Sequence, residues 1–161
     1  MDADEYAAGV AKAYQDEVMG EGMTCGFLAW CPDDLKTVMA TLLQLESEAK
    51  VRLRPLVHRM GLPLAEDERG RQIGREYAEG WRDIPWGEAA LKLAELAKPY
   101  LERFKQLEAA APDGDKPFLS YMVAHEQAII DYCELEAAGQ RQAGLDRLVS
   151  VLEHPLRGLP G

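Results

Sequence analysis

The sequence lacks several features that would place it in a common functional class. Its cysteines, Cys25, Cys31 and Cys133, form no Cys-x-x-Cys motif and are odd in number, so we expect buried reduced thiols rather than a zinc site. No apolar run is long enough to span a membrane, and the acidic start at residues 1–5 does not resemble a signal peptide. These absences predict a cytoplasmic protein that does not enter the membrane.

Basic residues are scarce. The chain has 18 Lys and Arg against 28 Asp and Glu, a formal net charge of −10. Because Lys and Arg contacts to phosphate dominate nucleic-acid affinity, this balance argues against a general nucleic-acid-binding surface. One local basic cluster contains Lys50, Arg52, Arg54 and Arg59. The four-residue spacing of Glu46–Lys50 and of Glu48–Arg52 favours ion pairs along one helix instead, so we expect no nucleic-acid partner.

Strand patterns are nearly absent: the chain has no alternating β-branched runs and no Asn-Gly hairpin turn. Nucleophile–base triads, phosphate loops and dinucleotide fingerprints are also missing. With 161 residues, of which 47% are hydrophobic, the chain is long enough to bury a core. We therefore predict a single all-α domain that spans residues 1–161.

Apolar spacing and helix-stop residues predict four long helices and two short ones. Gly20, Gly22 and Gly26 leave the second half of the first helix undecided. Pro55 is expected to kink or split the second helix, and Pro99 to bend the third long one. A long polar link, with a short helix inside it, joins the second and third long helices. The expected ranges are about 4–20 with an extension to 30, then 31–60, 66–81, 85–111, 116–138 and 143–153.

Three glutamates occupy positions that the helix pattern assigns to the interior. Glu21, Glu46 and Glu126 each lie in a stripe of apolar residues that recur every three or four positions, the spacing of one helix face. An ionised carboxylate is costly in a core unless something pairs with it. Three helices that each direct a carboxylate inward therefore predict a polar site inside a helical bundle.

The segments around these glutamates resemble the ferritin-like superfamily, in particular its small bacterial ferritin-like and rubrerythrin-like domains. The segments are residues 14–21 (YQDEVMGE), 42–46 (LLQLE) and 125–132 (HEQAIIDY). The resemblance implies a four-helix bundle with a long connection between its second and third helices. It also implies a core with two metal ions, bound by one glutamate from each of two helices and by Glu-x-x-His from each of the other two.

The chain departs from that ligand pattern. Ala49 and Ile129 stand where the two histidines belong, and the third long helix offers Tyr100 but no glutamate. Glu21 matches the carboxylate of the first helix, with Glu17 as a second candidate one turn away. His125 is a candidate replacement for a missing nitrogen ligand. The metal ligands implied by the resemblance are therefore Glu21, Glu46, Glu126 and His125.

Each of these residues has a structural alternative. For Glu46, an ion pair with Lys50 is as well supported as a role in a metal site. Glu21 and Glu126 have no cation on their own helix face, so each needs a partner from another helix: a metal, protonated His125, an arginine or a tyrosine hydroxyl. If no metal binds and the carboxylates converge, their repulsion predicts at least one raised pKa.

These observations support three hypotheses about function. The first is a ferritin-like protein with a degenerate carboxylate site that binds one ion, iron or another divalent metal, or none. The second is a di-iron-type oxidoreductase that uses the non-standard ligand set. The third is a protein-interaction module. The resemblance and the apolar segment 26–30 also predict a homodimer, whereas the sequence indicates no substrate and leaves open whether the protein is an enzyme.

Overall fold

The computed structural model describes residues 1–155, and this part of the chain is helical without any strand. The all-α class is therefore confirmed. The described helices include one short 3-10 segment, η1, and six α-helices. Their bounds are α1 (Ala3–Trp30), η1 (Asp33–Leu35), α2 (Lys36–Arg59), α3 (Glu68–Gly80), α4 (Trp86–Ala110), α5 (Lys116–Ala137) and α6 (Arg141–Val149).

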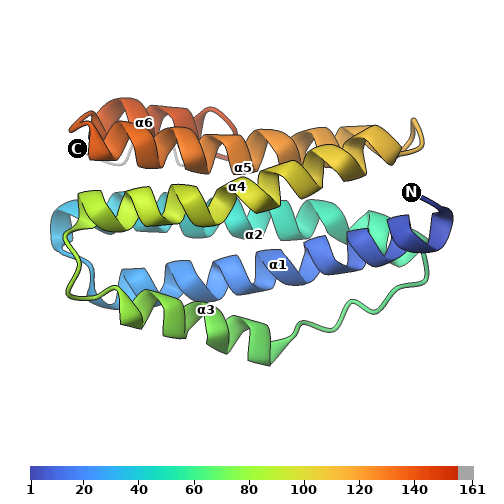
Figure 1. The fold of residues 1–161 in the computed structure, drawn as a ribbon, viewed down its shortest axis with the longest axis horizontal. Coiled ribbons are helices and arrows are strands. Elements are labelled where there is room, and N and C mark those ends of the chain that lie inside the picture. Colours follow the sequence, from blue (N-terminus) through green and yellow to red (C-terminus); the bar gives the residue numbers. More distant parts are fainter. Residues whose placement is uncertain (156–161) are drawn as a thin grey trace.

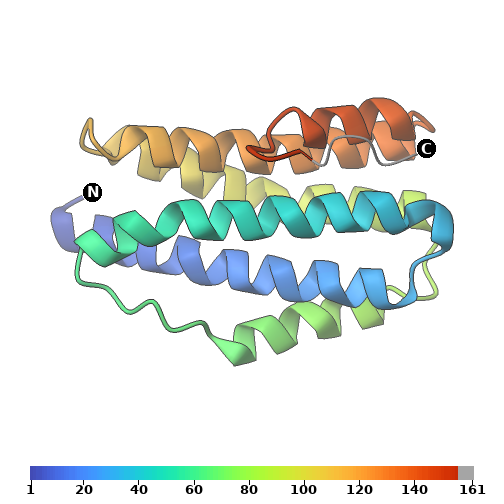
Figure 2. The same cartoon turned by 180° about the vertical axis from the view of Figure 1, so that it is seen from behind.

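The four long helices α1, α2, α4 and α5 lie alongside one another (Figures 1 and 2). Helix α3 packs on α1, and the short α6 packs on α5. Within the pairs α1–α2 and α4–α5 the chain reverses direction, whereas α2 and α4 run the same way. This parallel arrangement arises because residues 60–85, which include α3, cross the length of the molecule between α2 and α4.

Local signals explain where the helices begin and end. Asp2 caps α1 by accepting a hydrogen bond from the Glu5 amide, and the Glu5 side chain accepts one from the Asp2 amide. This reciprocal capping box satisfies backbone donors that the first turn leaves free. Gly61 and Gly139 follow α2 and α5 with φ of 67° and 73°, the left-handed conformation that glycine adopts most easily.

The second helix is not split at its proline. Helix α2 continues through Pro55, and α4 likewise continues through Pro99. Each proline removes one hydrogen bond to the carbonyl four residues earlier, which belongs to Val51 or Glu95. Val51, Glu95 and both prolines are exposed, so water can solvate the two carbonyl groups that lack a helical hydrogen bond. Of the two outcomes expected at Pro55, the split of the helix is therefore wrong, whereas a kink stays a prediction.

The glycines of the first helix serve close helix packing, and α1 runs unbroken to Trp30. A Cβ atom on Gly22 would lie 2.1 Å from the Arg71 carbonyl oxygen, and one on Gly26 would lie 2.6 Å from Ala78 Cβ. On the facing helix, a Cβ on Gly74 would lie 2.2 Å from the Met19 carbonyl oxygen. Only residues without side chains allow α1 and α3 to approach this closely, which outweighs the low helix propensity of glycine.

A polar layer divides the hydrophobic core into two clusters. One cluster contains Phe27 and Leu42, together with Ile129 from α5. The other contains Tyr14 and Leu53, with further members from α4 and α5. Between them, α1, α2 and α5 contribute buried or nearly buried polar side chains at residues 17–21, 46–50 and 125–126. The core thus leaves a polar site at mid-length of the long helices.

The basic cluster of α2 is neutralised by carboxylates from other elements. Lys50 pairs with Glu21 and Glu66, Arg54 with Glu66, Arg52 with Glu153, and Arg59 with Asp115. The expected helix pairs Glu46–Lys50 and Glu48–Arg52 are not among the ion pairs of residues 1–155, because partners outside α2 reach these cations instead. The cluster therefore forms no free positive surface.

Two further surface features bear on partners. The apolar segment 26–30, one basis for the predicted homodimer, packs within the chain: Phe27 is buried, and its ring contacts Trp30, Trp81 and Trp86. The homodimer stays a prediction. Across residues 1–155, none of the helices combines the length and the apolar character needed to cross a membrane.

Candidate metal centre

Three side chains from three helices converge in the polar layer: Glu17 from α1, Glu46 from α2 and His125 from α5. We call them the His125 group. One potential ligand atom of each lies within 4.8 Å of the others. Glu17 and His125 are only 2% and 0% exposed, and the Glu46 side chain is 12% exposed. The group therefore lies inside the helical assembly and not on its surface.

The separations between His125 and the two carboxyl groups of the His125 group are too long for hydrogen bonds but suit a shared ion. His125 Nε2 lies 3.6 Å from Glu17 Oε2 and 3.7 Å from Glu46 Oε2. Hydrogen bonds between such atoms are normally about 2.7–3.2 Å long. Two ligands that each lie about 2.1 Å from one ion at a tetrahedral angle are roughly 3.4 Å apart. The observed spacing is close to this value.

Several atoms of the group lack a hydrogen-bond partner. Within residues 1–155, neither Nδ1 nor Nε2 of His125 and not Oε2 of Glu17 has a partner, although all three atoms are buried. Orphaned buried polar atoms are rare in folded proteins and indicate an ion, a water molecule or a functional role. The donor set, one imidazole and two carboxylates, suits a divalent transition metal.

A glycine makes room for the Glu46 carboxylate. A Cβ atom on Gly20 would lie 2.3 Å from Glu46 Oε2 and 2.7 Å from the carboxyl carbon. Any larger residue at position 20 would therefore displace the Glu46 side chain or push α1 away from α2. The glycine that lowers the helix propensity at this point thus leaves room for the Glu46 carboxylate in the His125 group.

Burial sets the protonation states of these side chains. It lowers the pKa of His125 to about 3, so the imidazole is neutral at physiological pH and free to act as a ligand. Burial also raises the pKa of Glu46 to about 8, although a hydrogen bond with Glu17 opposes this shift. Burial, together with the charges of Glu46 and Glu126, raises the pKa of Glu17 well above its ordinary value. Without a metal, these carboxyl groups therefore hold protons that an arriving cation would displace.

Glu126 approaches the Nδ1 atom of the imidazole, whereas Glu17 and Glu46 lie near Nε2. Its Oε2 is 3.7 Å from His125 Nδ1, and the residue is 7% exposed. Burial and then the charge of Glu46 raise the pKa of Glu126 well above its ordinary value. Ligating histidines commonly direct their second ring nitrogen at a carboxylate, which fixes the tautomer of the ring. Glu126 is placed for that role.

Glu21 belongs to a different set of contacts. Its carboxylate accepts hydrogen bonds from Lys50 Nζ at 2.5 Å, Ser47 Oγ at 2.7 Å and Arg71 Nη1 at 2.8 Å. Glu66 also pairs with Lys50 and Arg71, and we call these five residues the Glu21 network. Burial alone would raise the pKa of Glu21, but the hydrogen bonds from Lys50, Ser47 and Arg71 outweigh it and lower the pKa.

The structure thus brings three of the four predicted ligands together and separates the fourth. Glu46, His125 and Glu126 lie near one another, and Glu17 stands where Glu21 was expected. Among the partners expected for Glu21, arginine is found, and Lys50 and Ser47, which were not expected, also contact it. Glu17 and Glu21 lie one turn apart on the same face of α1, so apolar spacing cannot distinguish them. Gly20, three residues after Glu17, is the local sequence signal that this turn of α1 lies close to another helix.

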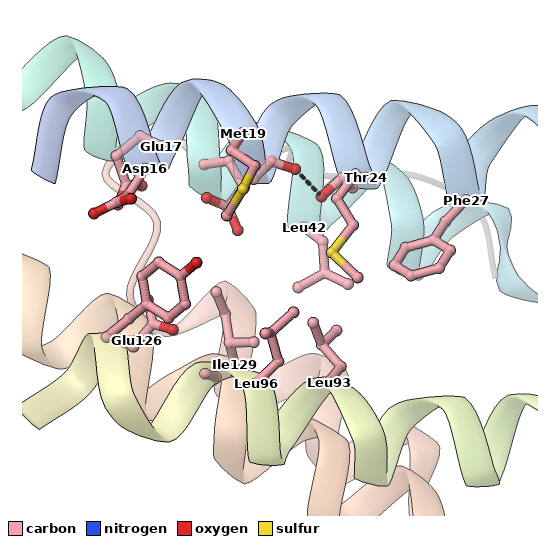
Figure 3. A pocket seen from close by; sticks show the side chains of 15 residues that line it. Asp16, Glu17, Met19, Thr24, Phe27, Leu42, Leu93, Leu96, Glu126 and Ile129 are labelled. Carbon is pink, nitrogen blue, oxygen red and sulfur yellow. Dashed lines mark hydrogen bonds between the residues drawn. The ribbon is translucent and has the colours of Figure 1, made fainter. Parts of the chain in front are cut away.

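A cavity of about 60 Å³, lined by residues of α1, α2, α4 and α5, adjoins the site. Figure 3 shows Asp16, Glu17 and Glu126 at one end of this cavity and Phe27 at the other. Its walls between the two ends are mainly apolar, with Met19, Met23, Leu42, Leu93, Leu96 and Ile129. The cavity therefore has one carboxyl-rich end beside the His125 group and one apolar end.

Comparison with protein-family models, with curated proteins and with solved structures finds no match for this chain. Arguments about its function therefore depend on the geometry and chemistry of the site.

Proposed function

We propose that this protein is a ferritin-like four-helix-bundle protein that binds one divalent transition-metal ion at Glu17, Glu46 and His125. The observation that carries the proposal is the set of buried, unpartnered atoms of His125 and Glu17, which face the carboxyl group of Glu46 at ligand spacing. The proposal keeps the degenerate metal site inferred from the sequence and replaces Glu21 by Glu17 as the ligand from the first helix.

The chain path supports the ferritin-like part of the proposal. Ferritin-like folds contain four long helices with one long crossover connection. Here α1, α2, α4 and α5 are the long helices, and residues 60–85 cross over between α2 and α4. A short crossover would make α2 and α4 antiparallel, so the parallel direction of these two helices is the informative feature.

The ligand count supports one ion rather than two. In residues 1–155, the His125 group is the only cluster of three potential ligand side chains at metal-binding spacing. Asp16 also lies at the cavity, but it pairs with Lys12 and Arg103 and is therefore not free to bind a second ion. A bound divalent ion would supply Lewis acidity or, with iron or manganese, redox chemistry. The di-iron oxidoreductase hypothesis lacks a second ligand set in this part of the chain.

Metal analysis of the purified protein tests this proposal. After expression in medium with added manganese, iron, cobalt or zinc, we expect close to one ion per chain after exhaustive dialysis. Glu17→Gln and His125→Ala should each lower the metal affinity at least about 100-fold, because each removes a direct ligand. Titration with Co²⁺, followed by its visible absorption, would report the affinity and the coordination number.

Glu21→Gln is the matched control. It removes a carboxylate from the same face of α1, one turn away, but leaves the His125 group intact. We expect it to retain near-stoichiometric metal while it lowers the stability of the fold. If no supplemented metal binds, or if Glu21→Gln abolishes binding and Glu17→Gln does not, the proposal is wrong.

A further inference from the structure

We propose that the ion pair between Asp16 of α1 and Arg103 of α4 gates the passage of a divalent metal ion between solvent and the His125 group. This inference rests on the proposed function and adds to it the route by which the ion enters and leaves. We call the pair the Asp16–Arg103 gate. The route is closed while the pair is formed, and it opens when the Arg103 guanidinium leaves Asp16 for solvent.

An entering ion needs oxygen atoms along its route, because a divalent cation gives up its hydration water only where oxygen ligands replace that water. Most of the cavity wall is apolar and offers none. Asp16 lies at the carboxyl-rich end of the cavity, next to Glu17 (Figure 3). Its partners Lys12 and Arg103 have side chains that are 58% and 27% exposed. Asp16 therefore connects the surface of the molecule with the buried ligands.

The chain's own cations occupy both oxygen atoms of Asp16. Arg103 Nη2 pairs with Oδ2, and Lys12 Nζ lies 2.9 Å from Oδ1. Among the carboxyl groups of residues 1–155 that line the cavity, only Asp16 pairs with lysine or arginine. An ion can therefore bind to Asp16 only after one of these cations has moved away, and the guanidinium also repels an ion that approaches it.

The Arg103 side chain is held by few contacts. In the part of the chain that the structure describes, it donates a hydrogen bond only to Asp16, and its Nε atom is buried without a partner. Its guanidinium also lies over the Tyr100 ring, at 4.7 Å from the centroid. A buried donor without an acceptor costs free energy that hydration would recover. Movement of Arg103 into solvent exchanges one ion pair for this hydration, so the open and closed positions are close in free energy.

The gate predicts parallel changes in the two rates of metal binding. Asp16 and Arg103 can pair before the ion enters and again after it has passed, so the pair contributes equally to metal-free and metal-bound protein. Loss of the pair should therefore speed association and dissociation by the same factor and leave the Kd unchanged. Loss of a direct ligand is different, because it raises the Kd mainly through faster dissociation.

Stopped-flow binding of Co²⁺ to the full chain, followed by its visible absorption, measures association, and an excess of chelator measures dissociation. Arg103→Met should raise both rates at least about fivefold and keep the Kd within about twofold of wild type. Asp16→Asn should slow association at least about fivefold, because the entering ion loses the first carboxylate on its route. Circular dichroism confirms that each variant is folded.

Lys105→Met is the matched control. It removes a positive charge from the same helix, at an exposed pair with Glu102 that does not contact the cavity. Both rates should stay within about twofold of wild type, since exposed charges are screened by salt. If Lys105→Met speeds binding as much as Arg103→Met, the effect is one of general charge and the gate is wrong.

The equilibrium metal content separates this inference from the proposed function. If the wild type binds no Co²⁺, both are wrong. If one ion binds per chain but Arg103→Met leaves both rates unchanged, the metal proposal stands and the gate is overturned, as expected for entry beside Glu46, whose side chain is 12% exposed. A change in dissociation alone also overturns the gate. If Arg103→Met does not fold, unchanged association in Asp16→Asn overturns it.

Discussion

Glu17 and Glu21 lie on successive turns of the same face of α1, and both are buried, at 2% and 6% exposure. Their surroundings are opposite. Glu21 receives hydrogen bonds from Lys50 and Arg71, whereas Glu17 faces Glu46 and a neutral His125. The comparison shows that burial alone does not make a carboxylate functional. What distinguishes the two sites is whether the chain itself supplies the compensating charge.

The source of that charge is the connection between α2 and α4. Arg71 lies on α3 and Glu66 lies just before it, so the segment that crosses the molecule carries two members of the Glu21 network. Around Glu17, α5 contributes the neutral His125 and the acidic Glu126, and neither supplies a positive charge. The Glu21 network therefore holds the crossover segment in place, and the His125 group is left for an external ion.

The largest expected effect comes from removal of the buried lysine. Lys50→Met should destabilise the protein by about 3 kcal/mol, because Glu21 would lose its closest cation in a buried position. Urea unfolding of wild type and variant measures this change. Lys98→Met, which breaks an exposed pair with Glu95, is the control and should change stability by less than about 0.5 kcal/mol. A loss below about 1 kcal/mol for Lys50→Met would contradict the structural role of the Glu21 network.

The same isosteric change at the two glutamates should give different results. Glu21→Gln should cost about 2 kcal/mol, since it leaves the two cations Lys50 and Arg71 with less compensation. Glu17→Gln in metal-free protein should stay within about 0.5 kcal/mol of wild type at pH 7. The reason is that a protonated Glu17 and a glutamine are both neutral and similar in size. Equal losses in chemical denaturation would show that the two sites do not differ as described.

The stability of metal-free protein should fall between pH 6.5 and 8. The pKa of Glu46 is raised from 4.5 to about 8, so its contribution is complete below pH 4.5 and is lost as the pH rises through about 8. The pKa of His125 is lowered from 6.5 to about 3, so its contribution is constant above pH 6.5. Each proton released adds a slope of up to about 1.4 kcal/mol per pH unit.

Thermal unfolding at several pH values measures this slope. Glu46→Gln should flatten it, and saturating zinc should reverse it, because metal and protons compete for the same carboxyl groups. A stability that is constant or rises from pH 6.5 to 8 in metal-free wild type would mean that these carboxyl groups are already ionised.

The smallest expected effect on stability is that of the glycine beside the site. Gly20→Ala would normally stabilise a helix by up to about 1 kcal/mol, but its Cβ would meet the Glu46 carboxylate. We expect these effects to offset each other within about 1 kcal/mol while the metal affinity falls about tenfold. Gly87→Ala in α4, where a Cβ meets no neighbouring atom, is the control and should leave metal binding unchanged. Unchanged metal affinity in Gly20→Ala would separate Glu46 from the ligand set.

The sequence by itself determined the helical class and the approximate helix ranges. Apolar spacing, the stop at Gly61 and the helix start after Pro85 depend on neighbours in the chain, and such local preferences persist in the fold. The glycines of α1 could not be interpreted in this way. Their role depends on how closely α3 approaches, and no local pattern contains that distance.

The sequence also indicated that carboxylates turn inward on three helices, because Glu46 and Glu126 interrupt apolar stripes. Only the tertiary structure decided which carboxylates are compensated. Arg71 reaches Glu21 from a helix 50 residues away along the chain, whereas no cation from residues 1–155 pairs with Glu17. Charge pairing acts through space over a few ångströms, so the partner of a buried carboxylate is known only once distant helices are packed together.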